Sequence, residues 1–224
     1  RNDVDYVMTY CTGRLQHQRI FPTHIFSCDN FYPYHDELLS VINKQYDNDK
    51  TYILKIDGTK EKVNNWQSKP DLHKSENFKQ FAEYIIEANK EVIRDRLQYE
   101  FDDIRITDMW ANHLKPGEYH PPHTHSNNVW SGVWYADAEQ TSGICFADPK
   151  VQANVIVPSS KSSIDNATVL QYTAKTNRIY LFPSWLYHWV PALQGNKTRT
   201  SVSWNIQLIG NVGKSTHFQS AYFD

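Results

Sequence analysis

The sequence has little of several features that would mark a special class of protein. Its 224 residues include only three cysteines and eight glycines, and 23 Lys and Arg stand against 25 Asp and Glu. Three cysteines are too few for a disulfide framework and favour a reducing, cytoplasmic location. The scarcity of glycine excludes collagen-like and low-complexity chains. The balanced charge gives no basic stripe of the kind that marks a nucleic-acid-binding surface.

Long apolar segments are also missing. No run approaches the roughly 20 residues that a membrane-spanning helix needs, and the first ten residues, RNDVDYVMTY, lack the apolar core of a signal peptide. We therefore expect neither a membrane span nor a secretory leader. Aromatic residues, by contrast, make up 14% of the chain. So many large side chains indicate a packed core rather than disorder, and the length suits a single domain.

The hydrophobic pattern changes along the chain from helical to strand-like. Apolar residues recur at helical spacing over 38–46 and 78–97, which predicts two helices. From residue 104 they alternate with polar neighbours, and turn signals separate the runs. The predicted strands are 19–26, interrupted at Pro22, then 104–114, 129–136, 143–146, 155–157, 169–172, 178–182 and 201–208.

Helices followed by many short strands predict an α+β chain, with N-terminal helices packed on a barrel-like or jelly-roll β core. We expect one domain over 1–224, with a helical portion at 1–103, the β core at 104–210 and a C-terminal tail at 211–224. The sequence leaves a homodimer open. A β-sandwich without any functional site would give the same pattern.

Histidines gather in one short segment, HPPHTH, which holds His120, His123 and His125. Alternate side chains of a strand share one face, so His123 and His125 are spaced as chelating ligands would be. A further histidine, His188, ends the aromatic stretch LFPSWLYH. Imidazole suits Fe, Zn, Cu or Ni, so these residues indicate a metal site without choosing the metal. A histidine cluster without metal, and a hydrogen-bonded core role for His188, are the alternatives.

A second polar pattern follows His188 by eleven residues. Arg199 and Ser201 are separated by one residue at the start of a predicted strand, so they share a face. The guanidinium fork binds a carboxylate through paired hydrogen bonds, and a serine hydroxyl adds a donor. The pair predicts a carboxylate clamp, and a surface charge at a strand end is the alternative for Arg199.

Taken in order, these motifs resemble a known family. G-x5-H-x-H at 117–125, the distal His188 and R-x-S at 199–201 are similar to the Fe(II)/2-oxoglutarate-dependent oxygenases. More narrowly, the chain resembles a group of such oxygenases from bacteria and phages, from about Phe21 to Leu208. The blocks that carry this resemblance are NNWQS (64–68), MWAN (109–112), HTH (123–125), SGVWY (131–135), FADP (146–149), LFPSWLYH (181–188) and the R-x-S strand.

The resemblance implies a fold and a reaction. The fold would be a double-stranded β-helix, a jelly-roll or cupin-like core, with N-terminal helices packed on it. The protein would use Fe(II) and 2-oxoglutarate to hydroxylate a small-molecule or peptidyl substrate, with release of succinate and CO2. The sequence does not identify that substrate.

The resemblance also implies roles for single residues. The metal ligands would be His123, His125 and His188. The residues that bind 2-oxoglutarate would be Arg199, Ser201 and Tyr135, although Tyr135 also suits an ordinary core position. Further pocket residues would be Trp110, Asn112 and His120, of which Trp110 and Asn112 could equally be packing residues.

One position departs from the usual pattern. His125 stands where the common iron triad has an Asp or Glu. Three neutral imidazoles would leave the iron with a charge of +2 rather than +1. His125 then either ligates as a third imidazole or stays outside the ligand set, with His120 as a spare candidate.

Two other classes of protein also fit part of the pattern. One is a three-histidine cupin-type dioxygenase that does not use 2-oxoglutarate, and the other is a non-catalytic metal-binding β-barrel. The cupin-type interpretation leaves the Arg199–Ser201 pair unexplained. Bound 2-oxoglutarate would separate the first interpretation from these two.

Overall fold

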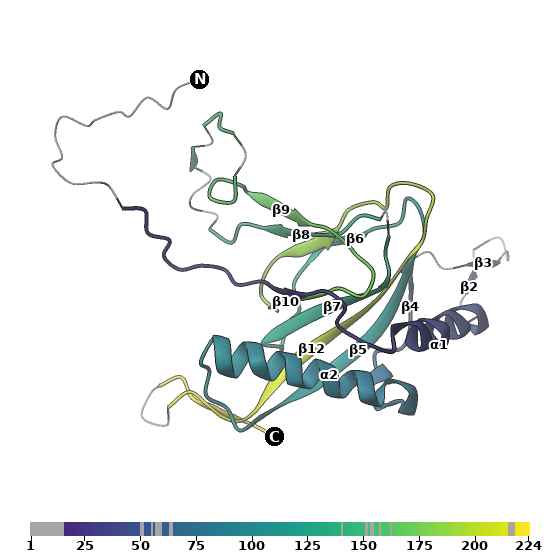
Figure 1. Ribbon diagram of the computed structural model, residues 1–224, viewed down its shortest axis with the longest axis horizontal. Helices are drawn as coiled ribbons and strands as arrows, with labels where there is room; N and C mark the ends of the chain where they lie inside the picture. The colour runs from purple at the N-terminus through teal and green to yellow at the C-terminus, as the bar shows by residue number, and fades with distance from the viewer. Residues whose placement is uncertain are drawn as a thin grey trace.

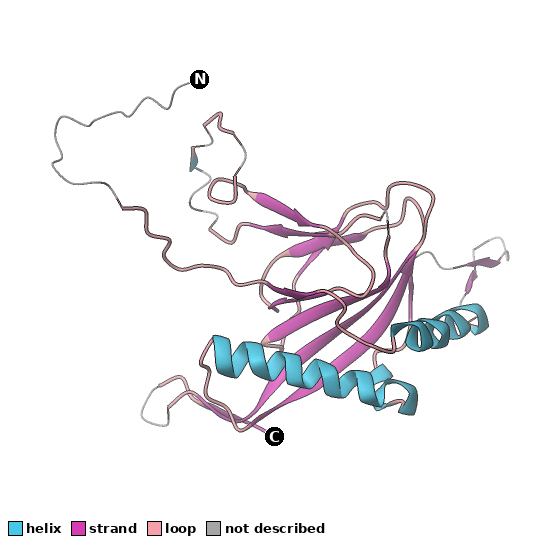
Figure 2. Cartoon of the chain, in the orientation of Figure 1, coloured by secondary structure: helices cyan, strands magenta, loops and turns pink. Residues whose placement is uncertain are grey.

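Two antiparallel β-sheets lie face to face, and two helices cover the outer side of the larger sheet in the computed structural model (Figure 1, Figure 2). The described residues are 16–49, 52–54, 56, 60–62, 65–139, 141–150, 152, 155–156, 158–161, 163–214 and 218–224. In this part of the chain, no helix is both long enough and apolar enough to cross a membrane.

The larger sheet has the strand order β1-β10-β7-β12-β5-β4, and β13 pairs with the far end of β12. Its strands are β1 (Phe26–Cys28), β4 (Trp66–Gln67), β5 (Asp103–Leu114), β7 (Trp130–Asp137), β10 (Ile179–Pro183), β12 (Arg199–Val212) and β13 (Ala221–Phe223). Seven of the eight residues of β7 are buried. This burial on both faces explains why the strand reads as a nearly continuous apolar run.

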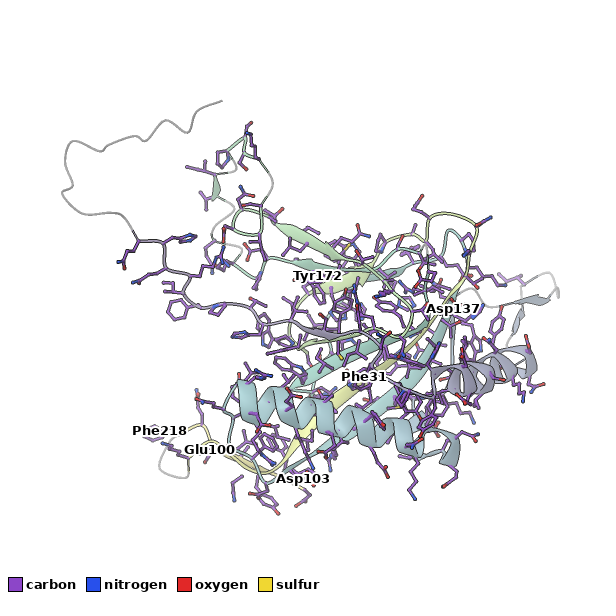
Figure 3. All side chains as sticks on the ribbon, viewed as in Figure 1. Phe31, Glu100, Asp103, Asp137, Tyr172 and Phe218 are labelled. Atoms are coloured by element: carbon purple, nitrogen blue, oxygen red, sulfur yellow. The ribbon has the colours of Figure 1, made fainter. Side chains whose placement is uncertain are left out.

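The smaller sheet has the order β6-β11-β8-β9. Its strands are β6 (His120–His123), β8 (Ile144–Ala147), β9 (Val169–Tyr172) and β11 (His188–Val190). A separate short pair is formed by β2 (Tyr52–Leu54) and β3 (Lys60–Lys62). In Figure 3, the labelled Tyr172 marks the smaller sheet and the labelled Asp137 marks the end of β7 in the larger one.

The helices are α1 (His35–Asn48) and α2 (Lys79–Lys90), and α2 continues as a π-helical turn, Glu91–Arg96. Two 3-10 turns, Leu72–Lys74 and Glu76–Phe78, precede α2. The apolar stripe of α2 buries Phe81 and Ile85 completely. Phe81 packs on Trp134 of β7 with ring centroids 4.8 Å apart, so the helix covers the sheet face opposite the smaller sheet.

A close approach between β7 and β12 explains the glycine of the SGVWY block. A Cβ atom on Gly132 would lie 2.3 Å from the indole of Trp204. Any larger residue would therefore push Trp204 out of the core between the helices and the larger sheet.

Both predicted helices are confirmed, and so are the strands predicted at 104–114, 129–136, 143–146, 169–172, 178–182 and 201–208, with shifted ends. The strand predicted at 19–26 is wrong apart from Phe26, because the side chains of Ile20 and Phe21 are largely exposed and find no core to join. Residues 155 and 156 form no strand, and residue 157 lies outside the described residues.

The predicted limits of the β core are too narrow at both ends. β1 and β4 come from the N-terminal portion, which was expected to be mainly helical, and β12 continues to Val212 and pairs with β13 in the expected tail. These additions are two or three residues long, too short to show a clear period of two.

Candidate metal and carboxylate site

A cavity of about 260 Å³ lies between the two sheets. It brings together every candidate residue predicted from the sequence: His120, His123, His125, His188, Arg199, Ser201, Tyr135, Trp110 and Asn112. A larger hollow of about 1050 Å³ runs along α2. It contains none of these residues and is lined mainly by the polar surface of that helix, so we place the chemistry in the smaller cavity.

Three histidines meet at one end of this cavity. His123 of β6 and His188 of β11 are direct partners in the antiparallel register. His125 follows β6, and its backbone N–H donates to the carbonyl of Ser184 at 2.9 Å. The ligand nitrogens of the three rings lie within 4.8 Å of one another, and Nε2 of His125 is 3.1 Å from Nε2 of His188. The three nitrogens can bind a single ion.

Two backbone carbonyls fix the rings of His123 and His188. Nδ1 of His123 donates to the Pro121 carbonyl, and Nδ1 of His188 donates to the Leu186 carbonyl, each at 2.7 Å. A carbonyl only accepts, so Nδ1 carries the proton and Nε2 keeps its lone pair. Histidine ligands of metals characteristically donate their second nitrogen in this way.

Burial keeps His120, His125 and His188 neutral. Burial, with a smaller contribution from nearby histidines, lowers the pKa of His188 to about 3 and the pKa of His125 to about 4. Burial also lowers the pKa of His120 to about 4, with a smaller contribution from the Arg199 charge. Neutral imidazole is the form that binds a metal. The centre is thus ready to bind a cation at neutral pH.

Arg199 brings an uncompensated positive charge to the same cavity. Its side chain is only 1% exposed, yet in the described part of the chain it forms no ion pair. Nη1 donates to the Ser142 carbonyl at 2.7 Å, and Nε has no hydrogen-bond partner. A buried, unpaired guanidinium is costly, so the cavity is suited to an anionic ligand.

Hydroxyl and amide groups surround this charge. In the register of the larger sheet, Ser201 of β12 lies between Asn112 of β5 and Tyr135 of β7. The Arg199 guanidinium carbon lies 5.6 Å from the centroid of the Tyr135 ring. Burial raises the pKa of Tyr135 to about 12, which keeps its hydroxyl protonated as a donor. Asn112 is 1% exposed, and its Oδ1 has no partner.

Other residues of the cavity were not predicted from the sequence. Gln67 of β4 faces Asn112 in the register, and Phe182 packs on His188 with ring centroids 4.7 Å apart. Both lie within sequence blocks that carry the family resemblance, so membership of those blocks could have indicated that they line the cavity. Ser142 contributes through its main-chain carbonyl, which no side-chain pattern can reveal.

The turn that leads into the histidine segment requires its glycine. Gly117 has a φ of +84° and closes the turn in which the Glu118 N–H donates to the Lys115 carbonyl at 3.0 Å. Glycine adopts this left-handed conformation without steric cost. The turn directs the chain from β5 of the larger sheet to β6 of the smaller one.

Comparison with known proteins agrees with this geometry. Residues 108–205 match the family model described as "Putative 2OG-Fe(II) oxygenase". They contain all nine candidate residues. No curated protein matches the chain.

Several solved structures share the fold. HygX from Streptomyces hygroscopicus, solved with nickel and 2-oxoglutarate bound, has a TM-score of 0.58 at 10% identity, covering 83% of each chain. The epimerase SnoN from nogalamycin biosynthesis, which is α-ketoglutarate dependent, has a TM-score of 0.59 at 9% identity, covering 88% of this chain and 81% of its own. A Pseudomonas putida prolyl-4-hydroxylase has a TM-score of 0.53 at 13% identity, covering 84% and 94%.

The fold and the cavity define a double-stranded β-helix protein with three clustered histidines on one sheet and a buried arginine on the other. Together with the match over 108–205, they make the chain similar to the Fe(II)/2-oxoglutarate-dependent oxygenases. This confirms the predicted fold class, and the match over 108–205 agrees with the predicted reaction class and co-substrate.

Proposed function

We propose that the protein inserts one oxygen atom into a C–H bond of its substrate, with Fe(II) held by His123, His125 and His188. In the balanced reaction, substrate, O2 and 2-oxoglutarate give hydroxylated substrate, succinate and CO2. The observation that carries the proposal is the joint presence, in one cavity, of three clustered imidazoles and a buried cation that has no counter-ion among the described residues.

The residues present fit both implied groups. Nε2 of His123 and of His188 are free to donate a lone pair because Nδ1 of each ring is bound to a carbonyl. When bound, iron supplies the electron chemistry that activates oxygen, which protein side chains cannot supply. His125 completes the set as a third neutral ligand, and His120 remains a residue of the cavity wall.

Arg199 binds the carboxylate of 2-oxoglutarate that is distant from the metal. Its unpaired Nε is available to that carboxylate, and the hydroxyls of Ser201 and Tyr135 are further donors. Charge-assisted hydrogen bonds in a buried site are the strong ones. Arg199 therefore fixes the co-substrate along β12, with its reactive end toward the histidines.

The substrate reaches the cavity without a positive charge. Arg199 is the only Lys, Arg, Asp or Glu that lines the described cavity, and one carboxylate of the co-substrate neutralises it. Bound Fe(II), held by three imidazoles, together with the other carboxylate would leave a net charge of +1, so a buried cation of the substrate would find no partner there. Trp110 and Asn112 offer an aromatic face and an unpaired amide to a small-molecule or peptidyl group.

The remaining parts of the proposal concern the whole chain. It acts as a single domain over 1–224, and it works in a reducing, cytoplasmic environment. The free thiols of Cys28 and Cys145 support the reducing environment.

Calorimetric titration of 2-oxoglutarate into anaerobic, Mn(II)-loaded protein tests the proposal. We expect one binding event per chain that depends on the metal, because one end of the co-substrate chelates it. His188→Ala protein is the control and should bind neither metal nor co-substrate. Absence of binding to the wild type would contradict the proposal.

A further inference from the structure

Three motif residues without a role so far meet behind the histidines. Ser131 of β7, Ser184 of the turn after β10 and Asn205 of β12 are all buried. The hydroxyl of Ser131 lies 2.7 Å from that of Ser184 and donates to Oδ1 of Asn205 at 2.8 Å. We call these three residues the Ser–Ser–Asn chain. Ser131 is 53 positions from Ser184 and 74 positions from Asn205 in the sequence.

The direction of the hydrogen bonds in this chain is fixed. Oδ1 of Asn205 can only accept a hydrogen bond, so the Ser131 hydroxyl donates its single proton to that oxygen. Ser184 must therefore be the donor to Ser131. Nδ2 of Asn205 faces the carboxylate of Asp108 at 3.5 Å, which orients the amide with Oδ1 toward Ser131. The chain has one proton arrangement and thus one preferred geometry.

The turn at 183–186 connects this chain to two histidines. The carbonyl of Ser184 accepts the backbone N–H of His125 at 2.9 Å, and the carbonyl of Leu186 accepts Nδ1 of His188 at 2.7 Å. The turn is closed by the Leu186 N–H, which donates to the Pro183 carbonyl at 3.0 Å. One short turn thus sets the backbone position of His125 and the ring orientation of His188.

The Ser184 hydroxyl makes the side-chain link from this turn to the larger sheet. Through Ser131 it reaches β7, and through Asn205 it reaches β12, the strand that carries Arg199. The Ser184 N–H adds a longer main-chain bond to the Val129 carbonyl at 3.2 Å. If the hydroxyl link is lost, the turn can move relative to the sheet, and the nitrogens of His125 and His188 move with it.

We propose that Ser131, Ser184 and Asn205 are positioning residues of the metal centre. They hold the turn so that Nε2 of His125 and Nε2 of His188 converge on one ion. This inference rests on the proposed function, in which those histidines bind Fe(II). It assigns a physical role to the serine of SGVWY, the serine of LFPSWLYH and the asparagine of the R-x-S strand.

The test compares two alanine variants with a matched control. Ser131→Ala breaks both links, and Ser184→Ala breaks one. Ser68→Ala is the control, because Ser68 is also buried and its hydroxyl also makes two hydrogen bonds, to the Lys69 carbonyl and from the Ala111 N–H, each at 2.9 Å. Mn(II) affinity is measured by paramagnetic resonance of the free ion, and the unfolding temperature is measured without metal.

Loss of a residue that orients metal ligands typically lowers metal affinity about 10–100-fold. We expect such a loss in Ser131→Ala and a smaller one in Ser184→Ala, whereas Ser68→Ala should bind Mn(II) as tightly as the wild type despite a similar loss of stability. If Ser131→Ala fails to fold, Ser184→Ala carries the test alone.

The outcomes separate the two proposals. Unchanged Mn(II) affinity in the folded variants overturns the positioning role while the proposed function stands. An equal loss in Ser68→Ala also overturns it, because general destabilisation would then explain the effect. A wild-type protein that binds no Mn(II) contradicts the proposed function itself.

Discussion

Replacing Arg199 by methionine should weaken 2-oxoglutarate binding strongly while it changes the free energy of unfolding little. Methionine fills much of the same space without charge and adapts to irregular gaps. In the protein without co-substrate, Arg199 is a buried cation whose Nε is unpaired and whose Nη1 holds the Ser142 carbonyl. The substitution removes the cost of burying this charge and also leaves that carbonyl without its donor.

These two effects act in opposite directions on the free energy of unfolding. An unsatisfied buried carbonyl costs about 1–3 kcal/mol, and relief from burying an uncompensated charge is of comparable size. We therefore expect the metal-free stability of Arg199→Met to stay within about 1 kcal/mol of the wild type. For a chain of this length, that is a change of about 2–4 °C in unfolding temperature.

The effect on co-substrate binding should be much larger. Removing one partner of a buried, hydrogen-bonded charge pair costs about 3–5 kcal/mol, which corresponds to a loss of affinity from about a hundredfold to a few thousandfold. In a thermal-shift assay on Mn(II)-loaded protein, 2-oxoglutarate at a hundred times its dissociation constant stabilises the wild type by about 2.7 kcal/mol. The same concentration should leave Arg199→Met almost unshifted, while Mn(II) affinity stays unchanged.

Wild-type affinity of Arg199→Met for 2-oxoglutarate would refute a carboxylate-binding role for Arg199. If that variant is also several kcal/mol less stable, Arg199 is a structural residue instead. Replacing the exposed Arg96, which pairs with Glu91 on the helix surface, by methionine is the matched control and should change neither quantity.

Three further predictions concern the histidines. His123→Ala and His188→Ala should each abolish stoichiometric Fe(II) binding in an anaerobic iron assay, and full binding by both would refute the ligand assignment. His125→Asp should retain iron because it restores the common two-histidine, one-carboxylate set; loss of iron in that folded variant would contradict a ligand role for position 125. The metal-free protein should lose stability as pH falls below about 6.5, because the unfolded chain then protonates His120, His125 and His188 while the folded chain, with pKa values of about 4, 4 and 3, does not. Denaturant titrations at neutral and mildly acidic pH check this sign, and equal stability at both would contradict it.

The parts of the fold that could be predicted from the sequence are those in which each segment carries its own period. The stripe of α2 and the alternation of β5 are visible within about a dozen residues. The whole of β6 is not among the predicted strands, because its sequence HPPH has two prolines that donate no hydrogen bond. β11 has only three residues. Both segments form strands because they pair with neighbouring strands, β6 with β11 and β11 with β8. These long-range pairings are visible only in the folded chain.

The sequence predicts which residues line the cavity, and their roles as ligands stay predictions. Histidine and arginine have few uses on the inner faces of a β core, so their spacing indicated chemistry before any contact was known. The Ser–Ser–Asn chain was hidden, because serine and asparagine are common and the importance of these three comes from long-range contacts. The role of Ser142 was hidden for a different reason, since any residue could supply that carbonyl.

Mass analysis of succinate formed under isotopically heavy O2 tests the central claim most directly. Iron-loaded protein is incubated with 2-oxoglutarate, and the succinate is compared with that from His188→Ala protein. The account predicts iron-dependent succinate that carries one heavy oxygen atom, because one atom of O2 enters the new carboxylate as CO2 leaves. Absence of succinate, or succinate without the heavy atom, would contradict it.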